Sequence, residues 1–248
     1  MHDSKFELAV QPILATGSAD ASGPSVEVLL RLPDERGRSP NSADFLRSAE
    51  RYQLMPQIDR WVVNAVLVAI KSGEIKLASN RSCAINISEQ TLSDKGFLSF
   101  VVEAMDHSGV SPAEVCFEVT ESAILTNVQH AQRFIEVLHG IGCEFVLGDF
   151  GSGLGAFSIL KNLPIDYLKI HGSYTNNVTT DQVNQEMVSA MIKLARMMDF
   201  RVIAEQVEEQ EDFDWLRSVG IDFVQGNFIE APAILGTTTT GSYRILNS

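Results

Sequence analysis

The chain has little of what would make it a nucleic-acid-binding or membrane-spanning protein. Basic residues are few: 19 lysines and arginines stand against 32 acidic residues, and the net charge of −13 argues against bulk electrostatic binding of a nucleic-acid polymer. No apolar run reaches the length of a membrane span, and no basic segment followed by an apolar one marks a secretion signal. We therefore expect neither a nucleic-acid polymer nor a membrane as a partner. A small nucleotide held by a few local cations is compatible with these counts.

Cysteine is also scarce. Cys83, Cys116 and Cys143 are odd in number, and each lies in an apolar, strand-like run. This pattern favours buried, reduced thiols in a cytoplasmic protein over a disulfide framework. No spacing of cysteine and histidine is typical of a zinc site. The cysteines therefore predict a cytoplasmic location and no structural zinc.

A long linker, a solenoid-scale repeat and a low-complexity tract are missing too, apart from the threonines at 237–240, which are expected to be surface coil. The 248 residues, 45% hydrophobic and 21% charged, suit one α/β barrel or two small domains. Because no linker divides the chain, we expect a single domain over 1–248.

Alternating strand and helix patterns predict a barrel. The run at 6–15 has the pattern of a strand, and the linker at 16–23 is too short for a crossover helix, so the strand at 25–32 is expected to return antiparallel. Further strands are expected at 83–87, 114–119, 143–147, 165–170, 202–204 and 222–224, and helices at 42–52, 56–72, 97–107, 130–139, 181–198 and 209–218, with a crossover through 157–160. The predicted fold class is α/β, a TIM-like (β/α)8 barrel with an antiparallel first strand.

Polar residues recur where these strands end. Any one of them has an ordinary structural explanation, such as a turn former or a solvated charge, but recurrence at one strand end after another favours a site. Carboxylates and an asparagine are hard oxygen ligands for Mg²⁺ or Mn²⁺, and an arginine and a lysine can balance a phosphate. Two metal ions could activate water for in-line attack on a phosphodiester. The residues are Gln11, Glu27, Arg31, Asn86, Glu118, Asp149, Lys169, Glu205 and Gln225.

Short motifs in the same order carry a resemblance to a known family. They are QPI at 11–13, EVLLR at 27–31, INIS at 85–88, FEVTES at 117–122, GDFGSG at 148–153, LKI at 168–170, AEQVE at 204–208, VQG at 224–226 and AP at 231–232. Together they resemble the EAL family, phosphodiesterases that hydrolyse cyclic di-GMP to linear pGpG on a TIM-like barrel with an antiparallel first strand. The resemblance covers nearly the whole chain.

The resemblance implies a role for each matching residue. Glu27, Asn86, Glu118 and Asp149 match metal ligands, Glu205 matches the glutamate near the attacking water, and Lys169 matches the catalytic lysine. Arg31 is expected on a phosphate, Asp59 on a guanine edge, and Glu121 as the anchor of the loop after Asp149, where Ser152 replaces a threonine. The implied ligand-binding set is Gln11, Leu30, Arg31, Asp59, Asn86, Glu205, Gln225 and Pro232.

One departure from the family motif dominates the functional expectation. Gly148 stands where the first of two consecutive aspartates bridges the metal pair, and glycine offers no side-chain oxygen. Losing that bridge is expected to cost several kcal/mol in the transition state. His171 for an aspartate, Gln206 for a glycine and Leu32 for a tryptophan are further departures.

The sequence therefore favours a degenerate domain that binds cyclic di-GMP without hydrolysing it, in which Lys169, Glu205 and the metal ligands are vestigial. No cofactor is expected to be needed for binding, and Mg²⁺ or Mn²⁺ only for residual activity. The likeness is to degenerate family members that act in type IV pilus and twitching control, which implies a PilZ-domain partner and a domain excised from a longer protein.

Two alternatives stay open. One is a slow phosphodiesterase that uses a single metal ion, and the other is a protein-interaction module with an empty pocket. Gly148→Asp is expected to restore metal binding if the other ligands are in register. Phe157, Ile159 and Leu160 could form a dimer face or pack onto the barrel, and packing is favoured.

Overall fold

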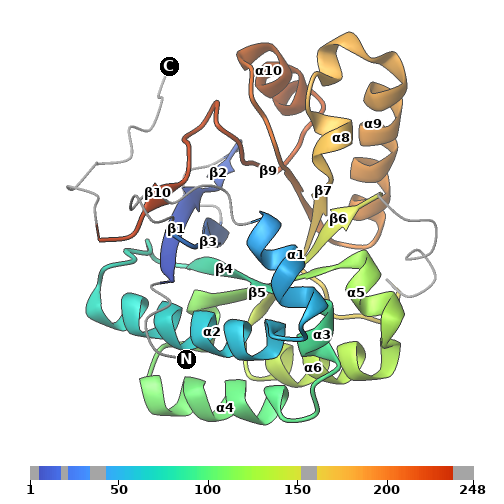
Figure 1. Ribbon diagram of the computed structural model, residues 1–248. Helices are drawn as coiled ribbons and strands as arrows, with labels where there is room; N and C mark the ends of the chain where they lie inside the picture. The colour runs from blue at the N-terminus through green and yellow to red at the C-terminus, as the bar shows by residue number, and fades with distance from the viewer. Residues whose placement is uncertain (1–5, 18–21, 34–42, 152–160, 237–248) are drawn as a thin grey trace.

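A computed structural model describes residues 6–17, 22–33, 43–151 and 161–236 (Figure 1). The crossover expected at 157–160, the replacement at Ser152 and the coil expected at 237–240 lie outside the described residues. All described strands belong to one sheet with the order β10-β1-β3-β4-β5-β6-β7-β8-β9-β2. The strands are β1 (Glu7–Pro12), β2 (Leu14–Ala15), β3 (Gly23–Arg31), β4 (Arg81–Ile87), β5 (Val115–Thr120), β6 (Glu144–Phe150), β7 (Tyr167–Ile170), β8 (Arg201–Ala204), β9 (Phe223–Val224) and β10 (Ala233–Ile234).

The first stretch of chain closes the sheet. β1 pairs antiparallel with β3, with Gln11 opposite Glu27, and β2 pairs antiparallel with β9. Because β1 and β2 are separated only by Ile13, one continuous segment joins both ends of the parallel array from β3 to β9. The TIM-like barrel and its antiparallel first strand are confirmed, as are the strands expected in each of the eight positions from 6–15 to 222–224.

Helices cover the outside of the curled sheet (Figure 1). The longest, α2, buries Ile58, Val62 and Val66 along one stripe, which matches the apolar period of the sequence. It ends at Gly73, whose φ of 76° allows its N–H to cap the carbonyls of Ala69 and Ile70. The helices are α1 (Ala43–Arg51), α2 (Met55–Ser72), α3 (Glu89–Leu92), α4 (Phe97–Ser108), η1 (Pro112–Glu114), α5 (Glu121–Thr126), α6 (Val128–Gly140), α8 (Gly172–Thr175), η2 (Val178–Thr180), α9 (Gln182–Met197) and α10 (Gln210–Ser218).

The barrel interior is filled at the end where the parallel strands begin. One inward-facing residue from each of the strands β4 to β9, together with Ile13 between β1 and β2, forms a separate apolar cluster there. The Tyr167 hydroxyl donates a hydrogen bond of 2.8 Å to Glu144. The Arg201 guanidinium lies over the Tyr167 ring. This plug leaves the opposite, carboxyl end of the strands for polar side chains. The cluster consists of Ile13, Ala84, Cys116, Val146, Tyr167, Ile203 and Phe223.

The larger core lies between the strands and the surrounding helices. Cys83 and Cys143 belong to it, and all three cysteines are buried and free of disulfides, as the sequence predicted. Among the described residues, no helix combines the length and the apolar character needed to cross a bilayer.

Candidate active site at the carboxyl ends of the strands

Strand alternation explains why the polar residues meet. Side chains two residues apart in a strand point to the same face, so the residue two positions after each member of the apolar plug also points into the barrel, one layer closer to the carboxyl end. In six consecutive strands, from β4 to β9, this rule selects the polar layer of Asn86, Glu118, Gly148, Lys169, Glu205 and Gln225. Gly148 is the member of this layer without a side chain.

Lys169 lies at the centre of the layer and pairs with two carboxylates. Its Nζ lies 2.8 Å from Glu27 Oε2 and 2.8 and 3.0 Å from the two oxygens of Glu118. These three residues are at most 7% exposed. Two buried acids thus converge on one positive charge, which can balance only one of them when both are ionised.

Amide side chains complete the hydrogen bonding of Glu27. Asn86 Nδ2 donates to Glu27 Oε1 at 2.6 Å, and Gln225 Nε2 donates to Glu27 Oε2 at 2.7 Å and to Gln11 Oε1 at 3.1 Å. Gln225 Oε1 is buried and has no hydrogen-bond partner among the described residues. A buried amide oxygen without a partner costs free energy, so this atom marks a place where a donor from a ligand would be favourable.

The carboxylates of the layer differ in their pKa values. Burial raises the pKa of Glu118 to about 8, against the attraction of Lys169, and the charge of Glu27 adds to the rise. Burial also acts to raise the pKa of Glu27, but its ion pair with Lys169 and its hydrogen bonds leave the pKa lowered. Burial raises the pKa of Glu205, against the attraction of Lys169 and the Gly172 N–H. Such separation of neighbouring acids is common in catalytic sites.

The Glu118 carboxylate occupies the space beside Gly148. A Cβ atom placed on Gly148 would lie 2.7 Å from Glu118 Oε1 and 3.2 Å from its Cγ. Contacts this short require that the Glu118 side chain move before residue 148 can carry any side chain. The missing aspartate and the position of Glu118 are therefore linked.

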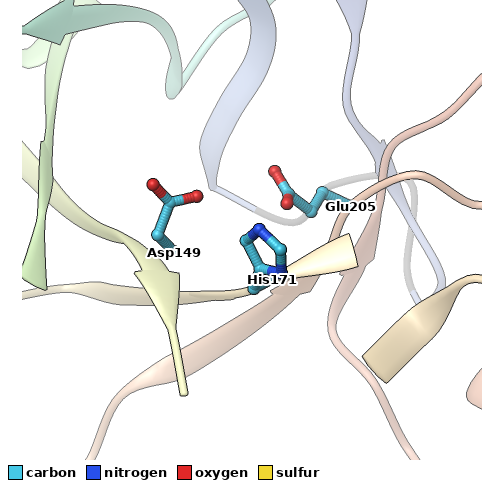
Figure 2. Close-up of side chains that lie close together, drawn as sticks. All are labelled: Asp149, His171 and Glu205. Atoms are coloured by element: carbon cyan, nitrogen blue, oxygen red, sulfur yellow. The ribbon is translucent and has the colours of Figure 1, made fainter. Parts of the chain in front are cut away.

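A second group of residues with side chains that commonly bind metal ions lies at the tips of β6, β7 and β8. Asp149, His171 and Glu205 each offer one ligand atom, and these atoms all lie within 4.8 Å of one another (Figure 2). The Gly172 N–H donates to Glu205 Oε1 at 2.7 Å and orients that carboxylate. In the sequence His171 is visible only as a departure from the family motif, because a linear pattern does not show that three strand tips converge.

The remaining predicted residues also lie near this end. Arg31 ends β3, where its Nη1 donates to the carbonyl of Leu30 at 3.0 Å. Asp59 in α2 is 5% exposed, and its Oδ2 accepts from the N–H and Oγ of Ser88 at 2.9 and 2.7 Å, just after β4. Pro232 is half-buried.

The segment that contains Pro232 is attached to the first strand, because Gln11 Nε2 donates to the carbonyl of Glu230 at 3.2 Å. Glu121, at the start of α5, is 3% exposed. The structure thus brings the inferred metal ligands into two adjoining groups and puts the other expected ligand-binding residues on surrounding elements.

The donor set fits a divalent cation. Carboxylate oxygens with an amide oxygen suit Mg²⁺ or Mn²⁺, and Glu27 and Glu118 already converge on a positive group, the Lys169 ammonium. The arrangement can therefore hold a metal ion, bind an anionic ligand through Arg31 and supply an acid or base through Glu205.

Comparison with known proteins gives the family and several relatives. A model of the EAL domain matches residues 1–232. The chain is 31% identical over 237 residues to cyclic di-GMP phosphodiesterase PdeB of Shewanella oneidensis, which covers 96% of this chain and 28% of that protein. It is 34% identical over 206 residues to cyclic di-GMP phosphodiesterase PdeF of Escherichia coli, which covers 83% of this chain and 27% of that protein. The chain therefore spans less than a third of the length of these relatives.

Solved structures share the fold. The PaMucR phosphodiesterase in complex with c-di-GMP matches with a TM-score of 0.84 at 27% identity, over 92% of each chain. The FimX EAL domain from Pseudomonas aeruginosa bound to c-di-GMP matches with a TM-score of 0.83 over 92% of this chain and 90% of that one. At 24% identity, this second likeness is one of fold.

The expectation that the domain is not an enzyme is wrong by this comparison, because the matched relatives are named as phosphodiesterases. The structure supplies a physical reason for the error. The loss at Gly148 removes one ligand, but five potential ligands survive in the two groups and His171 adds a sixth. The surviving carboxylate and amide ligands are Glu27, Asn86, Glu118, Asp149 and Glu205.

Proposed function

Because this chain belongs to the EAL domain family, we propose that it binds cyclic di-GMP at the carboxyl ends of its barrel strands and hydrolyses it to pGpG with divalent metal ions. The observation that carries the proposal is the polar layer together with Glu27 of β3: the acids Glu27, Glu118 and Glu205 surround Lys169 at one end of the barrel. Neighbouring acids that meet at the carboxyl end of a barrel are typical of catalysis rather than of stability.

Each residue has a task in this proposal. Glu27, Asn86, Glu118 and Asp149 would hold a metal ion, which would polarise the phosphodiester and lower the pKa of bound water. Glu205 takes a proton from the attacking water, and its raised pKa suits a base that works near neutral pH. Lys169 stabilises negative charge on the phosphoryl oxygens.

Other residues orient the nucleotide. Arg31 binds a phosphate in a bidentate way, and Asp59 accepts from a guanine edge. Gln225 has an unpartnered buried oxygen to offer to a donor. Leu30 and Pro232 supply apolar contact, and Gln11 holds the segment that carries Pro232.

The domain organisation, the cellular location and the protein partner are also proposed. A single barrel domain over 1–248 within a longer protein agrees with the length of the relatives. A cytoplasmic location agrees with three buried, unpaired cysteines. A role in pilus control with a PilZ-domain partner stays a prediction from the family likeness, since no described residue is specific to it.

The test is chromatography of pGpG after incubation with cyclic di-GMP and Mn²⁺, with EDTA as the metal-free arm. We expect pGpG with Mn²⁺ and none with EDTA. Glu205→Gln should lower the rate by about 100-fold or more, the usual effect of losing a general base. Glu103→Gln, on the exposed face of α4, is the matched control and should keep the full rate. Binding without pGpG at stoichiometric protein would contradict hydrolysis, and absence of binding would contradict the whole proposal.

A further inference from the structure

His171 belongs to no expected ligand set, yet its imidazole faces two carboxylates. The three side chains come from neighbouring strand tips: Asp149 from β6, His171 directly after β7 and Glu205 directly after β8 (Figure 2). Their ligand atoms lie within 4.8 Å of one another. One nitrogen and two oxygens thus converge from elements that the parallel pairing of β6, β7 and β8 holds side by side.

A bulge in β6 brings Asp149 into the group. The pairing of β6 with β7 shifts between Leu147 and Phe150, so Gly148 and Asp149 together oppose a single residue, Lys169. Asp149 has a φ of 54°, a left-handed conformation that is uncommon for a residue other than glycine. In a regular strand Asp149 would point to the face opposite Gly148, and the bulge redirects its side chain toward the strand tips. Backbone strain at a ligand-type residue is common at functional sites.

The orientation of the imidazole is also fixed. His171 Nδ1 lies 2.8 Å from Ser173 Oγ and 3.2 Å from the Ser173 backbone nitrogen. Because Nδ1 contacts Ser173, Nε2 is the nitrogen available to a metal. Coordination through Nε2 requires a proton on Nδ1, and Ser173 Oγ is placed to accept it, while the longer contact with the backbone N–H is given up. Metal-binding histidines commonly have such an outer hydrogen-bond partner.

We propose that Asp149, His171 and Glu205 bind a first-row transition-metal ion, with Zn²⁺ or Co²⁺ preferred to Mg²⁺. An imidazole nitrogen suits these ions, whereas Mg²⁺ favours oxygen ligands alone. The site uses no atom of residue 148, so it survives the loss of the bridging aspartate. The inference deepens the proposed function, since this ion would be one of the metals of the hydrolysis, with one carboxylate oxygen of Glu205 on the ion and the other facing the attacking water.

The geometry needs little adjustment. Ligand atoms at ~2.1 Å from one ion lie up to ~4 Å apart. The observed limit of 4.8 Å therefore requires a shift of under ~1 Å, within the reach of side-chain rotation at Glu205 or His171. The metal-free explanation is an imidazolium paired with two carboxylates, and it predicts no change in metal affinity when His171 is removed.

The experiment measures metal binding without nucleotide. Protein stripped with EDTA is titrated with Zn²⁺ and, separately, Mg²⁺ by calorimetry, and the Co²⁺-loaded protein is examined by proton NMR for a hyperfine-shifted imidazole N–H. We expect tighter binding of Zn²⁺ than of Mg²⁺ and one such signal from His171. His171→Ala should lose the signal and at least tenfold of the Zn²⁺ affinity, and His171→Asp should lose the signal while it gains Mg²⁺ affinity. His107→Ala, exposed on α4, is the control and should keep both readouts.

Equal Zn²⁺ affinity in the wild type and His171→Ala, or a shifted imidazole signal that persists in His171→Ala, would overturn the inference. Circular dichroism of each variant confirms folding. The two proposals fail separately: metal binding through His171 without pGpG would sink the proposed hydrolysis alone. Turnover with a metal affinity that is indifferent to His171 would sink this site alone.

Discussion

The nearest neighbour of a side chain at Gly148 would be Glu118, and that contact decides what a substitution at this position does. An aspartate would add a ligand between the two metal groups, but its Cβ would meet Glu118 Oε1 at 2.7 Å. The Glu118 carboxylate is the far end of a flexible side chain, and it accepts hydrogen bonds from Lys169 through both of its oxygens. A metal ion that takes over Glu118 would favour the same movement.

We expect Gly148→Asp to raise Mn²⁺ affinity and to raise the rate of pGpG formation by about tenfold or more, since a bridging carboxylate can contribute several kcal/mol to the transition state. Gly148→Ala is the matched control, because its Cβ makes the same contact with Glu118 but it has no carboxylate oxygens to bind a metal. It should lower Mn²⁺ affinity. Calorimetry and chromatography of pGpG provide the readouts, and equal behaviour of the two variants would show that sterics alone govern this position.

Glu118 also gives the site a pH dependence. Burial beside Glu27 raises its pKa to about 8, so below this pH the metal-free carboxyl holds a proton that a metal ion must displace. Apparent metal affinity should fall as pH drops from 8.5 to 6, by about tenfold per pH unit at most. Calorimetry with Mn²⁺ across this range measures how steeply the apparent affinity changes with pH. Glu118→Gln should bind more weakly and with a shallower slope, and an unchanged slope would assign the proton to another group, such as Glu205.

At the scale of elements, the strands and long helices could be predicted because their apolar periods are long enough to read. The layer at the carboxyl end could be predicted too, since alternation fixes which residues share a face. The short helices α3, α5 and α8 were not predicted, because four to six residues carry no clear period. The bulge at Gly148 and Asp149 was not predicted either, since it depends on how β6 pairs with β7.

Because the bulge gives Asp149 a left-handed φ, variants at this position can distinguish the effect of backbone strain from the effect of the carboxylate as a metal ligand. Asp149→Gly keeps the left-handed φ at a lower conformational cost but removes the carboxylate. We expect Zn²⁺ affinity to fall at least tenfold while the free energy of unfolding in urea, without metal, stays equal or rises by up to ~1 kcal/mol. Asp149→Ala should lose the affinity without that gain in stability. A large loss of stability in Asp149→Gly would mean that the carboxylate supports the fold rather than a metal.

At the scale of the whole molecule, the closed barrel means that a ligand bound at the strand tips should stabilise the entire folded domain. The segment that contains β1 and β2 pairs with both β3 and β9, and the apolar plug fills the opposite end, so a ligand at the strand tips contacts elements spread over the entire chain. Binding to the folded state alone stabilises it by about 2.7 kcal/mol at a ligand concentration one hundred times Kd.

Cyclic di-GMP with Mn²⁺ should therefore raise the midpoint of a single thermal transition in calorimetry, by several degrees. Either ligand alone should give a smaller rise. In Arg31→Ala, cyclic di-GMP should no longer raise the transition midpoint, whereas Mn²⁺ should raise it as in the wild type. Two separated transitions, only one of which responds, would contradict a barrel that unfolds as one unit.

The ion pairs of Lys169 have a consequence for the order in which the site is loaded. In the metal-free protein the ammonium neutralises part of the charge on Glu27 and Glu118. A divalent cation bound to these acids would replace these ion pairs and release the Lys169 ammonium. Under the proposed function, its charge would then be available to a phosphate of the substrate, so the contact between Lys169 and the substrate would form only after the metal has bound.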